Sequence, residues 1–134
     1  MNYRRYRYVT EFSGKAGATR VKANKVPEGF VLEVTQFSGG LMTEDTKKTE
    51  LGYTDVTGID RPVAMAKHDD FRNVEMTGEC WLVANEIPYV EISNMGDEKT
   101  GFISIHGKLW PTEEQVIRDA EIQQEDNLPD DSKP

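Results

Sequence analysis

A chain of 134 residues with 37% hydrophobic and 30% charged residues can form one domain with a modest core. Its composition excludes a collagen-like or coiled-coil protein, and no apolar run approaches the roughly 18 residues of a membrane-spanning helix, so no membrane contact is expected. The single cysteine, Cys80, excludes an internal disulfide framework and predicts folding in a reducing cytoplasm. Basic residues near the start are not followed by an apolar signal core, so we expect no secretion by a signal peptide.

The net charge of −8 is unevenly distributed along the chain. Residues 1–25 hold seven Lys and Arg against one Glu, a balance of +6, whereas residues 113–134 hold eight acids against two bases, a balance of −6. Such polarity predicts that both ends contact partners, for example a basic arm on the acidic surface of another subunit. The alternative is two solvated ends that bind nothing.

The first predicted strand spans residues 2–12, where aromatic residues of one parity alternate with arginines, as is typical of an edge strand. Tyr and Arg are enriched at the energetically important positions of protein interfaces, so this stretch predicts a docking arm for a protein partner. The predicted arm consists of Arg4, Arg5, Tyr6, Arg7 and Tyr8. Interleaved Arg and Tyr also suit nucleic acid, but the chain after residue 25 carries −14 and would repel a polyanion, so nucleic acid is not expected.

A small-residue connector and a Pro-Glu-Gly turn lead to the strand predicted at residues 30–37. Strand alternation places Phe30, Leu32 and Val34 on one face and Phe37 on the opposite, outward face. The Ser-Gly-Gly sequence that follows is expected to end the strand. Phe37 is therefore a candidate for an apolar subunit contact, with burial beneath a second sheet as the alternative.

The longest apolar-alternating region, residues 74–92, predicts two strands joined by a tight turn at Asn85-Glu86. Cys80 lies on the apolar parity of the first strand, where a free cysteine acts as a small hydrophobic side chain rather than a nucleophile. Trp81 lies on the opposite parity, so it is a second candidate for a subunit contact, again with burial as the alternative.

Further strands are predicted at residues 49–53, 62–67 and 101–109, which brings the total to about seven or eight. This pattern is typical of an all-β protein, an antiparallel β-sandwich or jelly-roll. A capping sequence that begins at Thr112 predicts a short C-terminal helix, followed by a disordered acidic tail. The expected organisation is a basic arm or edge strand (1–25), a sandwich domain (26–111), and the helix with its tail (112–134).

Residues suited to catalysis or metal binding are few. A cupin-type metal site needs two or three histidines and a carboxylate that converge from paired strands, but the chain has only His68 and His106. His68 beside two aspartates is interpreted as part of a turn, and His106 as a surface residue. No nucleophile elbow, phosphate loop or dinucleotide fingerprint is present. We therefore expect no metal, no cofactor and no enzymatic activity; a cupin-type metalloenzyme is the least favoured alternative.

Four segments together resemble small β-sandwich, jelly-roll-like structural proteins of tailed-bacteriophage virions, such as head decoration or cement proteins. They are VPEGFVLEVTQF (26–37), TELGY (49–53), VEMTGECWLVANEIPYVEI (74–92) and GFISIHGKLWP (101–111). The resemblance implies a non-enzymatic virion protein, made in the host cytoplasm and bound to the major capsid protein or other virion subunits. It further implies a symmetric homo-oligomer, with a trimer favoured. The motifs are turns and strands, so no catalytic residue is implied.

The alternative function is a jelly-roll module that binds a glycan or a host receptor. Such a module needs an aromatic platform, for which the candidates are Tyr53, Trp81 and Tyr89.

Overall fold

The computed structural model of the chain describes residues 2–14, 17–42, 48–66, 73–93, 95 and 99–113. Within these residues the protein is all-β: nine strands form two antiparallel sheets, which confirms the predicted sandwich. The predicted C-terminal helix and acidic tail lie outside the described residues, apart from their first two positions.

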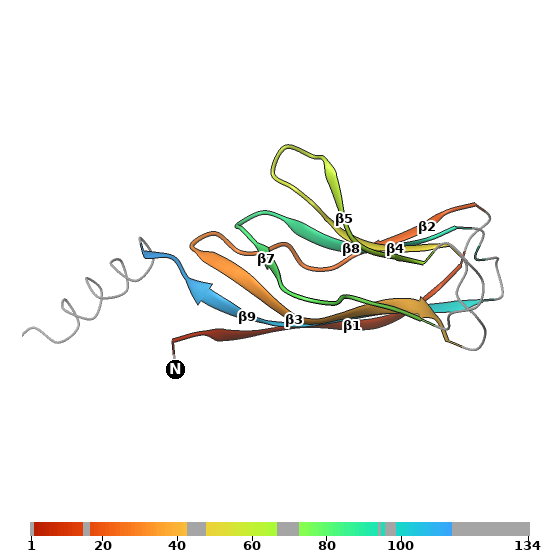
Figure 1. The fold of residues 1–134 in the computed structure, drawn as a ribbon, viewed down its shortest axis with the longest axis horizontal. Coiled ribbons are helices and arrows are strands. Elements are labelled where there is room, and N and C mark those ends of the chain that lie inside the picture. Colours follow the sequence, from red (N-terminus) through yellow and green to blue (C-terminus); the bar gives the residue numbers. More distant parts are fainter. Residues whose placement is uncertain are drawn as a thin grey trace, which may run out of the picture.

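The two sheets lie face to face, with sheet A below sheet B in Figure 1. Sheet A has the order β1 (Arg4–Ser13), β9 (Thr100–Pro111), β3 (Phe30–Leu41) and β6 (Asn73–Glu75), and β7 (Cys80–Leu82) also pairs with β3. Sheet B has the order β2 (Thr19–Lys22), β8 (Ile87–Ile92), β4 (Thr49–Thr54) and β5 (Asp60–Ala66). Five strands, β1, β3, β4, β8 and β9, correspond closely to predicted strands, and β5 overlaps the strand predicted at residues 62–67. The first strand predicted within residues 74–92 is divided into β6 and β7, and β2 falls just after the predicted connector and was missed.

The core lies between the sheets and is filled by alternate residues of their facing strands. Strand β9 shows the alternation along its whole length, with Ile103 and Ile105 buried and their neighbours half-buried. Leu51 and Val90 of sheet B are fully buried on the opposite side of the core. Burial of each such aliphatic side chain contributes about 1.5–3 kcal/mol, so this alternation is the main source of stability.

Strand β3 contains a β-bulge that the sequence analysis missed. Val34 pairs with Gly107 and Gln36 pairs with His106, so Thr35 is an extra residue without a partner in the register. One extra residue reverses which face the following side chains occupy. Phe37 is consequently in the core, with 2% of its surface exposed, and the prediction that it points outward is wrong.

The Ser-Gly-Gly sequence does not end β3, which continues to Leu41. A Cβ atom on Gly39 would lie 2.9 Å from Val90 Cγ2 and 3.0 Å from Leu51 Cδ2, both in sheet B. The glycine therefore marks a close approach of the two sheets inside a strand, rather than a turn.

The turn predicted at Asn85-Glu86 is present, and Asn85 has a left-handed φ of 72°. It joins β7 of sheet A to β8 of sheet B, so it carries the chain from one sheet to the other. The Asn85 amide donates to the Val26 carbonyl at 2.7 Å, and the buried Glu86 carboxylate accepts from the Val83 amide at 2.8 Å. These bonds satisfy polar groups that would otherwise be costly to bury at the crossing.

Candidate interaction surface

The predicted docking arm is a full strand of the sandwich, because β1 pairs with β9 from Arg4↔Leu109 to Ser13↔Thr100. Tyr6 is 5% exposed, and its hydroxyl donates to the Asn24 carbonyl at 2.5 Å; burial also raises the pKa of Tyr6. Tyr8 packs against the core from the same parity. The Arg4 guanidinium lies 5.0 Å from the centre of the Phe30 ring.

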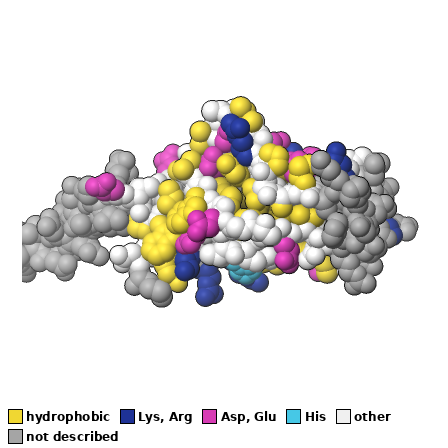
Figure 2. All heavy atoms as spheres, viewed as in Figure 1, with side chains coloured by type: hydrophobic (Ala, Val, Ile, Leu, Met, Phe, Trp, Pro, Cys, Tyr) yellow, Lys and Arg dark blue, Asp and Glu magenta, His cyan; other side chains and the backbone are white. Residues whose placement is uncertain are grey.

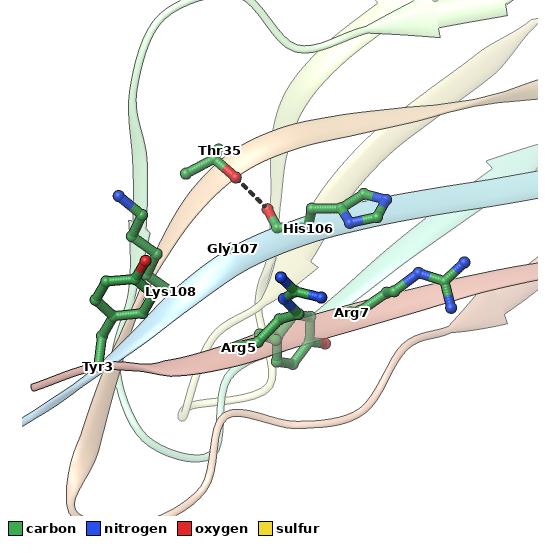
Figure 3. A pocket seen from close by; sticks show the side chains of 8 residues that line it. Tyr3, Arg5, Arg7, Thr35, His106, Gly107 and Lys108 are labelled. Carbon is green, nitrogen blue, oxygen red and sulfur yellow. Dashed lines mark hydrogen bonds between the residues drawn. The ribbon is translucent and has the colours of Figure 1, made fainter. Parts of the chain in front are cut away.

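Only two of the five predicted arm residues, Arg5 and Arg7, belong to the face of sheet A that points away from sheet B. On this outer face they border a groove of about 430 Å³, which we call the basic groove (Figure 3). Its lining consists of Tyr3, Arg5, Tyr6, Arg7, Thr35, His106, Gly107 and Lys108. The bulge helps to shape this groove, and the Thr35 hydroxyl donates to the His106 carbonyl at 3.1 Å.

The strand register concentrates positive charge in the basic groove. Arg5 is directly opposite Lys108, and Arg7 is directly opposite His106. Side chains in such positions are about 4.5–5.5 Å apart at Cβ, and the like charges of Arg5 and Lys108 there oppose folding. In Figure 2, dark-blue and cyan side chains project together from the lower margin of the molecule, beneath sheet A.

Within the described part of the chain, no acid pairs with the cations of the basic groove. Glu33 is opposite Lys108, but its carboxylate accepts from Trp110 Nε1 at 3.0 Å. Lys108 Nζ lies 4.9 Å from the centre of the Tyr3 ring, which in turn lies 5.0 Å from the Trp110 ring. The aromatic residues thus orient Lys108, which makes no direct ion pair within the described residues although Glu33 lies opposite it in the register.

Trp81, the other predicted contact residue, is 50% exposed and lies on the same outer face. The register forms a row across sheet A, from Arg5 to Lys108, Glu33 and then Trp81. The structure therefore places three predicted residues, Arg5, Arg7 and Trp81, on one outer face, with strands β9 and β3 between Arg5 and Trp81. It places Tyr6, Tyr8 and Phe37 toward the core.

The outer face of sheet B differs, because its arginine is fully engaged. Arg20 is 2.9 Å from the Asp60 carboxylate and 3.0 Å from the Glu91 carboxylate, and its guanidinium lies 4.1 Å from the Tyr89 ring centre. The Tyr89 hydroxyl donates to Glu50. This cluster fixes β5 against β2 and β8, so its role is structural. Sequence reasoning missed it, since the three charged partners come from separate strands.

The aromatic platform expected for a glycan-binding module is not formed. Tyr89 is fully buried beneath Arg20, and Tyr53 packs against the core from the inner face of sheet B. Trp81 lies on the other sheet, with no contribution from these two tyrosines.

Cys80 and the metal-ligating residue types were the sequence candidates for reactive chemistry. Burial, followed by the charge of Glu86, raises the pKa of the Cys80 thiol, which opposes formation of a reactive thiolate. No group of three metal-ligating side chains occurs among the described residues, and His68 lies outside them. No helix in the described part of the chain is long and apolar enough to cross a membrane.

The connection between β4 and β5 is organised by Asp55, whose carboxylate accepts four hydrogen bonds. Oδ1 accepts from the Thr57 amide (2.9 Å), the Thr57 hydroxyl (2.6 Å) and the Ile59 amide (3.0 Å), and Oδ2 accepts from Arg61 Nε (3.0 Å). The Thr57 hydroxyl and the Ile59 amide are the main causes of a pKa far below the ordinary value for Asp55.

We expect Asp55→Asn to lower the thermal unfolding midpoint relative to the parent at neutral pH. The difference between the two proteins should become smaller in acid. A carboxyl group with a lowered folded-state pKa stabilises fully above its unfolded pKa, about 3.9, and this stabilisation is lost as the pH falls toward the folded-state value. The difference between the thermal unfolding midpoints of the two proteins should therefore be constant from pH 7 to about pH 5, begin to shrink near pH 4 and continue to shrink down to pH 2. Glu11→Gln, on an exposed position of β1, is the control. A midpoint difference that is constant with pH would contradict this account.

Comparisons with known proteins support the fold only. No protein-family model matches the chain, and no curated protein matches it. A chain in the acidic stable capsid structure of Helicobacter pylori bacteriophage KHP30 is similar with a TM-score of 0.53 and 13% identity, over 81% of this chain and 89% of that one. A chain of the Drosophila NLP core gives a TM-score of 0.43 and 13% identity, over 78% of this chain and 96% of that one. The sandwich is thus a fold that also occurs in a phage capsid structure.

Proposed function

We propose that the chain is a non-enzymatic structural protein of a bacteriophage virion that decorates or cements the capsid. The observation that carries this proposal is the fold shared with the phage capsid structure over 81% of the chain. The unreactive environment of Cys80 agrees with a structural rather than a catalytic role.

The outer face of sheet A is the proposed contact surface for the major capsid protein or another virion subunit. Arg5, Arg7 and Trp81 lie on this face, and Arg and Trp are enriched at interface hot spots. Because the cations have no acidic partner within the described residues, an acidic patch on the partner would be complementary. Strand β1 also ends sheet A, so strand addition along its edge provides a route to the proposed homo-oligomer, a trimer.

The proposal is tested with particles assembled from the genome that encodes the chain. We expect mass spectrometry to find the chain in purified particles at a fixed copy number relative to the major capsid protein. Particles that lack the chain should bind it when it is added back. Arg5→Glu/Arg7→Glu should weaken this binding at least about tenfold, which corresponds to about 1.4 kcal/mol.

The matched control is Lys22→Glu/Lys25→Glu, which changes the net charge equally but alters exposed residues outside the outer face of sheet A. This control should bind as the parent does. Absence of the chain from purified particles would refute the virion role, whereas equal weakening by both double variants would refute the assignment of the contact face.

A further inference from the structure

We propose that the acidic C-terminal segment, residues 113–134, folds back and binds the basic groove of its own molecule. All of this segment except Glu113 lies outside the described residues. The proposal concerns the free protein and does not depend on the virion role. It rests on the cations of the groove, which make no ion pair within the described residues, and on the charge and attachment point of the segment.

The basic groove offers donors suited to carboxylates. Arg5 and Arg7 on β1 face Lys108 and His106 on β9, and the structure gives the three permanent cations no ion pair within the described residues. Arginine binds carboxylates through two parallel hydrogen bonds. A carboxylate between β1 and β9 would also relieve the repulsion between Arg5 and Lys108.

The segment supplies carboxylates in adjacent pairs. It holds eight acids against Arg118 and Lys133, a balance of −6. Three pairs of neighbouring acids occur, namely Glu113-Glu114, Glu125-Asp126 and Asp130-Asp131. Because a single exposed ion pair contributes little free energy, the segment would need several carboxylates to bind at once, and its three acid pairs supply them.

The attachment point places the segment beside the groove. Strand β9 ends at Pro111, and the Thr112 amide donates to the Gly29 carbonyl at 2.8 Å. The groove residue His106 lies five positions before Pro111, which is about 17 Å along a strand. The 20 residue-to-residue steps from Thr112 to Ser132 span about 66 Å when fully extended, and about 30 Å if the whole segment is helical. The segment can therefore turn back and pass over the whole groove.

The tether favours the same molecule over a second copy. A short linker gives a tethered ligand an effective concentration in the millimolar range, well above that of free protein in dilute solution. Nucleic acid is the less favoured ligand, because the molecule carries −8 overall and would repel it outside this face.

The test uses the full chain with a nitroxide spin label on Ser132→Cys, in a Cys80→Ala background that leaves one labelling site. In nuclear magnetic resonance spectra, the nitroxide broadens the amide signals of residues near it. The amide signals of Arg5, Arg7 and Lys108 should therefore lose most of their intensity, while those of Val21 and Lys22 in sheet B keep theirs. In 1 M salt, where the screening length falls from about 10 Å to about 3 Å, the lost intensity should return.

Arg5→Glu/Arg7→Glu should abolish the broadening, and Lys22→Glu/Lys25→Glu should retain it; a dispersed amide spectrum verifies that each variant is folded. A mixture of copies that carry only the spin label with copies that carry only the isotope label distinguishes binding within one molecule from binding between copies. Because the segment is proposed to bind its own molecule, the isotope-labelled copies should show no broadening. Broadening in the mixture would overturn the proposal in favour of a contact between copies. If the spin label and the isotope label are in the same molecule and the groove signals are not broadened, the proposal is also overturned. A shift of these signals on addition of single-stranded DNA would then assign the groove to nucleic acid.

Discussion

Phe37→Ala is expected to destabilise the protein by about 3–5 kcal/mol, the usual cost of removing a buried aromatic side chain. Phe37 is 2% exposed and belongs to the core because the bulge at Thr35 turns it inward. Urea unfolding followed by circular dichroism measures the change, as a lower transition midpoint with an unchanged slope.

Trp81→Ala is the matched control, because Trp81 is also aromatic but half-exposed. It should cost about 1 kcal/mol or less, as substitutions at exposed positions usually do. Equal destabilisation by the two variants, or a larger effect at Trp81, would contradict the bulged register of β3.

Gly107→Ala is expected to destabilise the protein by about 1–3 kcal/mol through overpacking. An added Cβ would lie 2.5 Å from the Glu33 carbonyl oxygen and 2.7 Å from Leu32 Cδ1. The first contact is with backbone, which cannot move without disturbing the pairing of β3 with β9 beside the bulge. Thermal unfolding should show a midpoint several degrees lower, at about 2–8 °C per kcal/mol for domains of this size range.

Glu11→Ala is the control for Gly107→Ala, because it removes atoms from an exposed position of the neighbouring strand β1. Its midpoint should remain close to that of the parent. An unchanged midpoint for Gly107→Ala would show that β9 and β3 are farther apart at Gly107 than the structure places them.

Most strands could be predicted because strand alternation is a local property of the sequence. Residues 101–109 show it without interruption, and the structure confirms a strand there. The bulge at Thr35 could not be predicted, because its cause is the fit between β3 and β9, which are far apart in the sequence. Gly39 was misread for the same reason, since the side chains that require a glycine come from sheet B.

The contact surface was predicted only in part. The sequence of the first residues predicted a docking arm of Arg4, Arg5, Tyr6, Arg7 and Tyr8 and placed the tyrosines on one parity, but it did not show which parity faces the core. Lys108 was missed altogether, because its place opposite Arg5 depends on the pairing of the first and last strands. Parity along β1 now accounts for the inward position of Tyr6 and Tyr8.

The basic groove includes Thr35, the extra residue of the bulge, and Gly107, which has no side chain, while its charged lining comes from side chains of β1 and β9. Mutation of those side chains would change the charge of the groove and leave the bulge in place. Relatives that retain the extra residue and the glycine could carry acidic or neutral rims and recognise different ligands. The ligand preference of such relatives would then change while the two-sheet fold stays the same.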